Sequence, residues 1–225
     1  MKKFILYTIL LLAAVSCVKE SEYNRTLGLL SEYNSLPNSG GSTQVAVFSN
    51  TDWTVSMEPK VLWASIDRLG GHKSGHLVFD YEINYGRARR TLLVFKAGNE
   101  TMTLNMYQEG GISDEDCVMD LQVEDDKIEA TAEGLVMEIP FETNLVYNLN
   151  EMFLTLTYPV GQEPVQDWIT LKSVEATKVT IEIAPNNTGE ERQANVKLSH
   201  TDAGSLKSTE GDTIYSNTLT VVQTL

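Results

Sequence analysis

Alternating apolar and polar residues in the first half of the chain predict a block of three consecutive β-strands. Residues 76–84 carry apolar side chains at every second position up to Ile83, as in a strand with one buried and one solvated face. Residues 85–87 predict a turn, and residues 88–95 and 101–108 predict the two strands that follow.

The same alternation recurs on both sides of this block, between residues that favour turns. Residues 43–49 and 53–57 predict two strands of a hairpin, because the Asn and Asp side chains of residues 50–52 can bond to their own backbone. Further alternating runs lie at residues 117–123, 136–141, 152–158, 179–183, 192–198 and 219–223. The sequence therefore predicts an all-β protein.

The two halves of the chain share an ordered set of positions. The matched positions are Trp63 with Trp168, Asn84 with Asn186, the cluster Arg87, Arg89 and Arg90 with Arg192, and Gln108 with Gln223. Each half has roughly the 100 residues of an immunoglobulin-like sandwich. We therefore predict two tandem immunoglobulin-like β-sandwich domains, residues 25–111 and 117–225, joined by an acidic linker at residues 112–116.

The N-terminal segment differs from the rest of the chain. In residues 1–16, two lysines precede an apolar run too short to span a bilayer, and small residues follow. This is the pattern of a secretory signal peptide, and a buried N-terminal helix is the alternative. Residues 14–17, Ala-Val-Ser-Cys, resemble the lipobox of bacterial lipoproteins. We predict that Cys17 carries lipid and that residues 17–24 form a tether.

The residues after Cys17 and the charge of the chain indicate a location. The residue after Cys17 is Val18 and not the Asp that is associated with retention in the inner membrane. Lys19-Glu20 resembles the export signal of surface lipoproteins in the Bacteroidetes. We predict a protein that is lipid-anchored in the outer membrane and displayed on the cell surface. Its formal net charge of -14 argues against binding nucleic acid or an anionic membrane by charge.

Five short features of the first half resemble the BACON domain (Bacteroidetes-associated carbohydrate-binding, often N-terminal). They are Gly40-Gly41, residues 49–53 (Ser-Asn-Thr-Asp-Trp), Trp63 with Ser65-Ile66, Asn84 with Gly86-Arg87, and residues 107–110 (Tyr-Gln-Glu-Gly). The second half looks like a divergent copy, with Tyr147 in place of the first Trp. The resemblance implies an exported all-β module, common beside glycan-degrading enzymes, that binds carbohydrate or mucin.

The turn of the opening block supplies candidate binding residues. Tyr85 lies beside Gly86 and is expected to be exposed. Arg87, Arg89 and Arg90 could clamp a carboxylate or sulfate of an acidic glycan. The alternative, which we favour, is that the arginines pair with Asp80 and Glu82 on the adjacent strand.

Two tryptophans allow two interpretations. Trp53 and Trp63 could stack on sugar rings, but each is in phase with apolar neighbours, which favours the core. Gln108 and Gln223 close the two domains and are expected to satisfy backbone groups. Cys117 is expected to be a small, partly buried residue, with a reactive thiol as the alternative.

The sequence contains no nucleophile elbow, HExxH, P-loop or Cys–His set, so we predict no enzyme, no catalytic residue and no cofactor. Glycines 70, 71 and 75 disfavour a helix that would join His72 and His76, and no metal site is predicted. The leading function is a non-catalytic surface lipoprotein that binds polysaccharide or mucin glycans. The alternative is a structural spacer or a lipoprotein that binds other surface proteins. Exposed aromatic residues at one sandwich end would favour the first function, and buried tryptophans the second.

Overall fold

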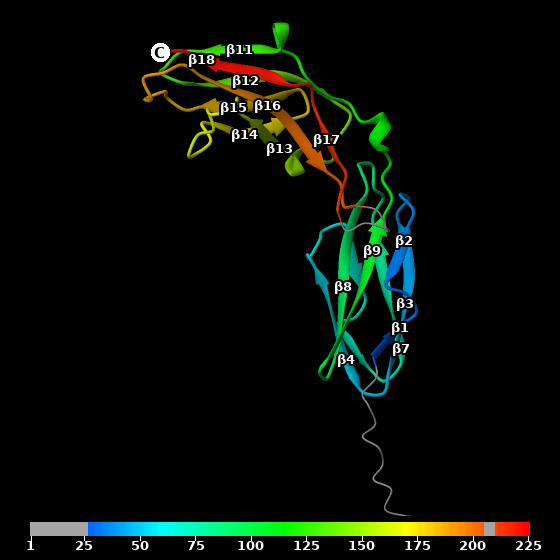
Figure 1. Cartoon of the computed structure of the whole chain (residues 1–225). Coiled ribbons are helices and arrows are strands. Elements are labelled where there is room, and N and C mark those ends of the chain that lie inside the picture. The colour runs from blue at the N-terminus through cyan, green and yellow to red at the C-terminus, as the bar shows by residue number, and fades with distance from the viewer. Residues whose placement is uncertain (1–26, 205–209) are drawn as a thin grey trace, which may run out of the picture.

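The computed structural model describes residues 27–204 and 210–225. The predicted signal peptide, Cys17 and the tether lie outside these ranges. The regular secondary structure of the described residues is almost entirely β-strand, with loops and three short 3-10 turns between the strands (Figure 1). Within the described ranges, no helix has the length and apolar character needed to cross a membrane.

The first domain is a sandwich of two sheets. One sheet has the order β1-β3-β7-β5 and the other has the order β2-β9-β8-β4-β6. The strands of the first sheet are β1 (Leu27–Leu29), β3 (Gly41–Ser49), β7 (Gly75–Tyr81) and β5 (Ala64–Ile66). Those of the second are β2 (Tyr33–Leu36), β9 (Glu100–Gln108), β8 (Arg89–Ala97), β4 (Asp52–Glu58) and β6 (Gly70–His72).

The second domain repeats this arrangement. Its sheets have the orders β10-β12-β15-β14 and β11-β18-β16-β13, with β17 paired to β16. The first contains β10 (Met119–Leu121), β12 (Leu135–Thr143), β15 (Lys178–Ile183) and β14 (Ile169–Glu175). The second contains β11 (Lys127–Ala130), β18 (Leu219–Gln223), β16 (Arg192–Thr201), β13 (Phe153–Thr157) and β17 (Thr213–Tyr215). In each domain the early strand β2 or β11 runs parallel to the last strand, β9 or β18.

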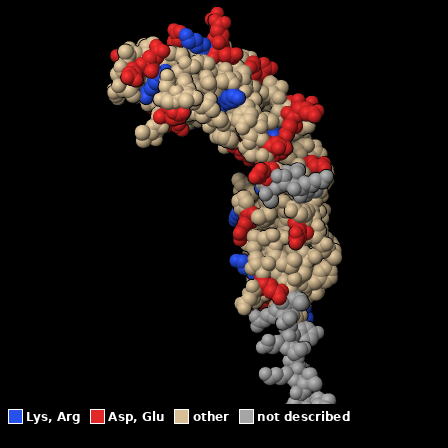
Figure 2. All heavy atoms as spheres, in the orientation of Figure 1, with Lys and Arg blue, Asp and Glu red and all other residues tan. Residues whose placement is uncertain are grey.

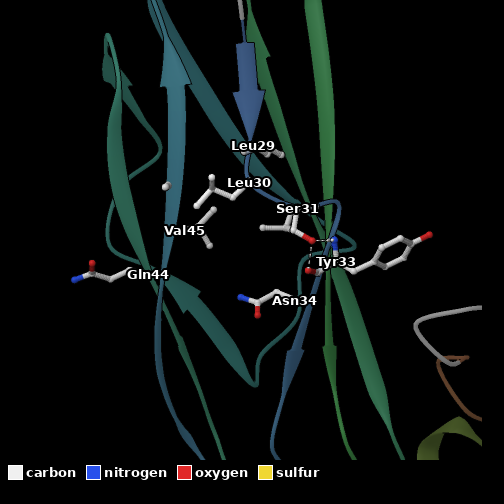
Figure 3. Close-up of a pocket in the computed structure, with 9 residues that line it drawn as sticks. Leu29, Leu30, Ser31, Tyr33, Asn34, Gln44 and Val45 are labelled. Atoms are coloured by element: carbon white, nitrogen blue, oxygen red, sulfur yellow. Dashed lines mark hydrogen bonds between the residues drawn. The ribbon is translucent and has the colours of Figure 1, made fainter.

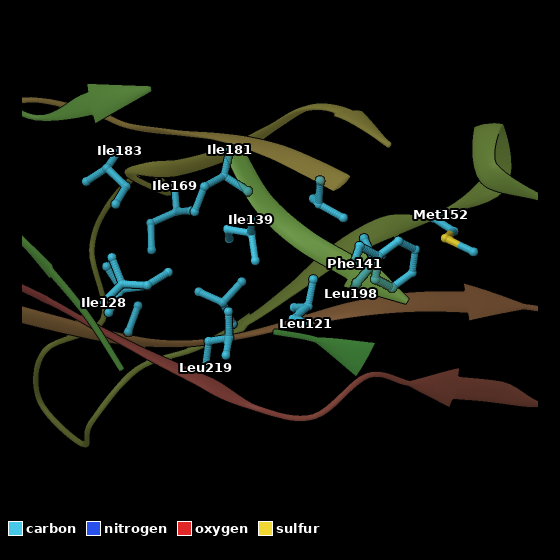
Figure 4. Close-up of a cluster of buried hydrophobic side chains, with 14 of the residues drawn as sticks. Leu121, Ile128, Ile139, Phe141, Met152, Ile169, Ile181, Ile183, Leu198 and Leu219 are labelled. Carbon is cyan, nitrogen blue, oxygen red and sulfur yellow. The ribbon is translucent and has the colours of Figure 1, made fainter. Parts of the chain in front are cut away.

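Each sandwich has its own hydrophobic core. The alternation in the sequence puts Leu77 and Phe79 inside the first domain, where Trp53 and Phe95 face them from the other sheet. Figure 4 shows the core of the second domain, in which isoleucines and leucines of both sheets interdigitate. Fully burying one such side chain stabilises the fold by about 1.5–3 kcal/mol. The prediction of two tandem immunoglobulin-like sandwiches is confirmed.

Two local predictions are wrong. Strands β3 and β4 do not form a hairpin, because β3 pairs with β1 and β7 whereas β4 pairs with β6 and β8. Alternation locates a strand without identifying its partner, and residues 50–52 instead lead the chain from one sheet to the other. Strand β7 ends at Tyr81, so Ile83 leaves the sheet and is 44% exposed.

Short 3-10 turns lie between the strands of the second domain. They are η1 (Asp114–Asp116) in the linker, η2 (Glu124–Asp126) and η3 (Leu149–Glu151). Figure 1 shows the two domains joined end to end with a bend, and η1 lies close to that junction. Figure 2 shows that acidic side chains outnumber basic ones on the face drawn, in keeping with the negative net charge.

Candidate functional site

The loop between β7 and β8 carries most of the predicted binding residues, and its shape is fixed by Asn84. The Asn84 side chain donates hydrogen bonds to the carbonyl oxygens of Arg87 (2.8 Å) and Glu109 (3.0 Å). Its Oδ1 accepts a hydrogen bond from the backbone N–H of Gly86 at 3.1 Å. This closed loop directs Arg87 out of the first sandwich and toward the second domain.

Arg87 is fully buried at the junction of the two domains. Its Nη2 and Nε donate to Asp114 Oδ1 at 2.6 and 2.9 Å, which ties the guanidinium to the linker. Nη1 donates to the carbonyl oxygen of His200 at 3.0 Å, and Nη2 to that of Asp212 at 2.9 Å. The guanidinium therefore connects the first domain, the linker and the second domain.

His200 continues this network into the second domain. Its Nδ1 lies 2.9 Å from Arg87 Nη1, and its Nε2 lies 3.1 Å from Glu151 Oε2. A guanidinium can only donate hydrogen bonds, so Nδ1 must accept and Nε2 carries the proton. The hydrogen bond from His200 holds the pKa of the Glu151 carboxyl below its ordinary value.

Further contacts seal the junction. The backbone N–H of Arg87 donates to Asn148 Oδ1 at 3.2 Å, and that of Ala203 donates to the Ala88 carbonyl at 3.3 Å. The rings of Tyr85 and Tyr147 stack across the junction with their centroids 5.2 Å apart. Both tyrosines remain exposed to solvent, Tyr85 at 52% and Tyr147 at 66%. The junction therefore presents a pair of stacked aromatic rings to solvent.

Three carboxylates meet around the Arg87 guanidinium. Oxygen atoms of Asp114, Asp202 and Asp212 lie within 4.8 Å of one another, a spacing that could hold a metal ion. Arg87 Nη2, however, lies 3.9 Å from Asp202 Oδ2 and bonds directly to Asp114. Because the guanidinium already supplies positive charge to this cluster, we assign no metal to it.

Arg89 packs within the first domain on Trp63. Its guanidinium carbon lies 4.5 Å from the centre of the Trp63 ring, and its Nε donates to Gln108 Oε1 at 2.8 Å. Its Nη2 donates to the backbone carbonyl of Glu82 at 3.0 Å, so the predicted pairing with the Glu82 side chain is replaced by a backbone contact. Burial lowers the pKa of this guanidinium.

The second domain repeats the Arg89 cluster. Arg192 lies 4.4 Å over the Trp168 ring and donates to Gln223 Oε1 at 2.8 Å. Gln108 and Gln223 each donate to backbone carbonyls of their own domain, as expected. These arginine–tryptophan–glutamine clusters stabilise each sandwich. In each cluster the arginine covers one face of the tryptophan ring, so that face is not available to a sugar.

Trp53 lies in the core. It is 3% exposed, and its indole N–H donates to the Lys73 carbonyl at 2.8 Å. Cys117 is half-buried, and burial raises the pKa of its thiol, which disfavours the reactive thiolate. Trp53 therefore belongs to the core, and Cys117 is a partly buried packing residue, as the sequence analysis favoured.

Arg90 lies apart from the junction, on the outer face of the sheet β2-β9-β8-β4-β6. It lines a pocket of 350 Å³ together with residues that the sequence analysis did not select, among them Tyr33 and Asn105. Asn105 alternates with the core residues Leu104 and Met106 of a predicted strand, which placed it on the outer face without marking it as a site, whereas no strand was predicted around Tyr33. A second pocket, of 180 Å³, lies beside Tyr33 between β2 and β3 (Figure 3). It is smaller than the roughly 300–1,000 Å³ of typical ligand sites.

Comparison with known proteins places a family match in the second domain. Residues 158–224 match the family described as "BACON: Putative binding domain, N-terminal". The match falls in the half that we expected to be the more divergent copy. It is consistent with a non-catalytic binding role for this part of the chain. No curated protein matches the sequence.

Solved structures resemble the chain at low identity. Human Protocadherin-24 EC1-2 is 10% identical, covers 89% of this chain and 97% of its own, and has a TM-score of 0.35. A chimeric titin Z1Z2-Z1Z2 tandem is 8% identical, with coverages of 89% and 100% and a TM-score of 0.34. The Bacteroides ovatus GH5 xyloglucanase in complex with a XXXG heptasaccharide is 14% identical over 49% of this chain, with a TM-score of 0.35. This chain spans 22% of the length of that enzyme.

Proposed function

We propose that the protein is a lipid-anchored surface protein that binds polysaccharide or mucin glycans without catalysis. The observation that carries the proposal is the exposed, stacked pair Tyr85 and Tyr147 at the end of the first sandwich. Aromatic faces suit the apolar side of sugar rings, and loops at sandwich ends commonly bind ligands. The match of residues 158–224 to a binding domain supports the same function.

The arrangement of the domains supports display away from a membrane. The first described strand, β1, lies at the end of the first domain that is opposite to the second domain (Figure 1). A lipid on Cys17 would therefore hold the first domain near the membrane and the junction farther out. Labelled fatty acid should be incorporated into the wild-type protein and not into a Cys17→Ser variant. Equal labelling of both would contradict the anchor.

A glycan array with the purified full-length protein tests the binding function. We expect binding to at least one host or plant polysaccharide, and weaker binding by a Tyr85→Ala, Tyr147→Ala double variant. Phe153→Ala, a change at another exposed aromatic residue of the second domain, is the control. An array without signal above background would contradict the proposal.

A second function, as a spacer or a partner-binding lipoprotein, is favoured by the buried tryptophans. Trp53 and Trp168 are 3% and 4% exposed, so these rings are not available to sugars. The hydrogen-bonded junction at Arg87 also suits a protein that holds its two domains in a fixed arrangement. Cross-linking on intact cells would then capture surface proteins, while the glycan array would stay without signal.

A further inference from the structure

A row of side chains crosses the outer face of the first domain from β2 to β4. Tyr33 is opposite Asn105, Asn105 is opposite Leu92, and Leu92 is opposite Glu58. Residues that are directly opposite in a sheet share a face, so the row presents an aromatic ring, an amide, an aliphatic group and a carboxylate in line. From this row we infer a saccharide-binding site for uncharged sugar units, separate from the tyrosine pair at the junction. The inference rests on the proposed glycan-binding function.

The row lies in the pocket of 350 Å³ described above. This volume falls within the range of about 300–1,000 Å³ that is typical of small-molecule sites. All lining residues belong to the first domain, and Arg90 and Thr103 add a cation and a hydroxyl beside the row. The site therefore requires no contribution from the second domain.

Asn105 is the feature that points to a ligand. Its side chain is on the outer face, yet the residue is only 6% exposed. Its Oδ1 is buried and has no hydrogen-bond partner among the described residues. A buried amide oxygen without a donor costs free energy, and such groups are few in folded proteins. The terminal torsion of Asn is broad, so a small rotation can turn this oxygen toward a hydroxyl group in the pocket.

The composition of the pocket indicates an uncharged ligand rich in hydroxyl groups. Glu32 and Glu58 line it as exposed carboxylates, and with Asn105 Oδ1 they offer acceptors to hydroxyl donors. The same two carboxylates repel a sulfate or a uronic acid, despite the presence of Arg90. Leu92 and the Tyr33 ring supply the apolar surface on which the C–H groups of a sugar ring pack. These features differ from the acidic-glycan clamp that the arginine cluster suggested in the sequence.

Titration calorimetry with the full-length protein tests the site. The probes are a neutral oligosaccharide that binds on the array, a sulfated oligosaccharide and an extended uncharged peptide. We expect Asn105→Leu and Tyr33→Ala to raise the Kd for the neutral sugar about tenfold or more, since a site built to bond a hydroxyl loses strongly when one partner is removed. Thr101→Leu changes an exposed residue of β9 on the same face outside the pocket, and should leave the Kd unchanged.

The thermal midpoint of each variant separates binding from folding. Asn105→Leu removes an unsatisfied buried group, so its midpoint should stay at or above that of the wild type. If Asn105→Leu does not fold, Tyr33→Ala carries the test, and an unchanged Kd in that variant overturns the site.

The remaining outcomes are distinct. A wild-type protein that binds no glycan overturns the proposed function and this site together. If the wild-type protein binds the neutral sugar and both Asn105→Leu and Tyr33→Ala bind it with the same Kd, the site alone is overturned. Preference for the sulfated sugar, or binding of the peptide only, overturns the assignment to uncharged sugars.

Discussion

Arg87 of the first domain and His200 of the second lie side by side, with Nη1 and Nδ1 2.9 Å apart and both side chains shielded from solvent. This contact joins two sandwiches whose hydrophobic cores are otherwise separate. The geometry of the whole molecule therefore depends on a small polar network rather than on a shared core.

Replacing Arg87 should loosen the junction without unfolding either core. In Arg87→Met, Asp114 and His200 lose their hydrogen-bond partner. Breaking a buried charged network lowers the free energy of unfolding by about 3–5 kcal/mol, and the loss is smaller here because Asp114 is partly exposed. We expect two separate unfolding transitions in urea and a broader range of domain orientations in small-angle scattering. Arg68→Met, which removes an exposed pair with Asp67, is the control. A single transition at the wild-type midpoint would contradict the role of Arg87.

Acid should weaken the same junction. The pKa of Glu151 is lowered in the folded protein, chiefly by the hydrogen bond from His200. Below the ordinary glutamate pKa of about 4.3, the unfolded state binds more protons than the folded one, so this stabilisation is present above that pH and is lost as the pH falls.

Stability curves measured between neutral pH and about pH 3 test this dependence. Glu151→Gln should be less stable than the wild type at neutral pH and should lose less stability on acidification. Glu142→Gln, which changes an exposed carboxylate elsewhere in the second domain, should follow the wild-type curve. Parallel curves for the wild type and Glu151→Gln would show that Glu151 does not contribute.

Gly86 permits the close approach of the domains. A Cβ atom at this position would meet Asn148 Oδ1, far inside van der Waals contact. Gly86→Ala should therefore displace the junction and cost about 1–3 kcal/mol, as other overpacking substitutions do. Gly75→Ala is the matched control, because no atom lies within 4 Å of its added Cβ. Equal thermal midpoints for the two variants would show that the loop adjusts freely.

Arg192 should resist replacement by lysine. A lysine cannot both cover the Trp168 ring and reach Gln223 and the Ala184 carbonyl, which Arg192 bonds at 2.8 Å. We expect Arg192→Lys to lower the free energy of unfolding of the second domain by about 1–2 kcal/mol. Lys172→Arg, on an exposed part of β14, should have little effect. Urea denaturation followed by circular dichroism measures the difference.

The periodicity of the sequence predicted most of the fold and much less of the site. Alternation located β7, β8 and β9 because each strand has one face in the core, and the phase of Trp53 placed that ring inside. The false hairpin of β3 and β4 arose because two strands facing each other across a core show the same pattern as two paired strands.

Long-range contacts explain what the sequence could not provide. Arg87 and His200 are 113 positions apart, and nothing in the local pattern around either residue connects them. The exposed position of Tyr85 was predicted, but its stacking on Tyr147 depends on how the second domain is placed. Asn105 was indistinguishable from other polar outer-face residues until its lack of a hydrogen-bond partner was seen.

The contact at the junction also depends on the order of the two domains along the chain. The loop of the second domain that corresponds to residues 84–89 runs from Asn186 to Arg192 and contains no arginine between these two residues. In the first domain, Ala97 of β8 stands at the position that corresponds to His200 of β16 when Arg89 is matched with Arg192. A permuted chain with its domains in reverse order would keep both cores and both tryptophan clusters, yet it would lose the contact that fixes one sandwich against the other. The two domains share one strand arrangement, but the differences between them determine how they fit together.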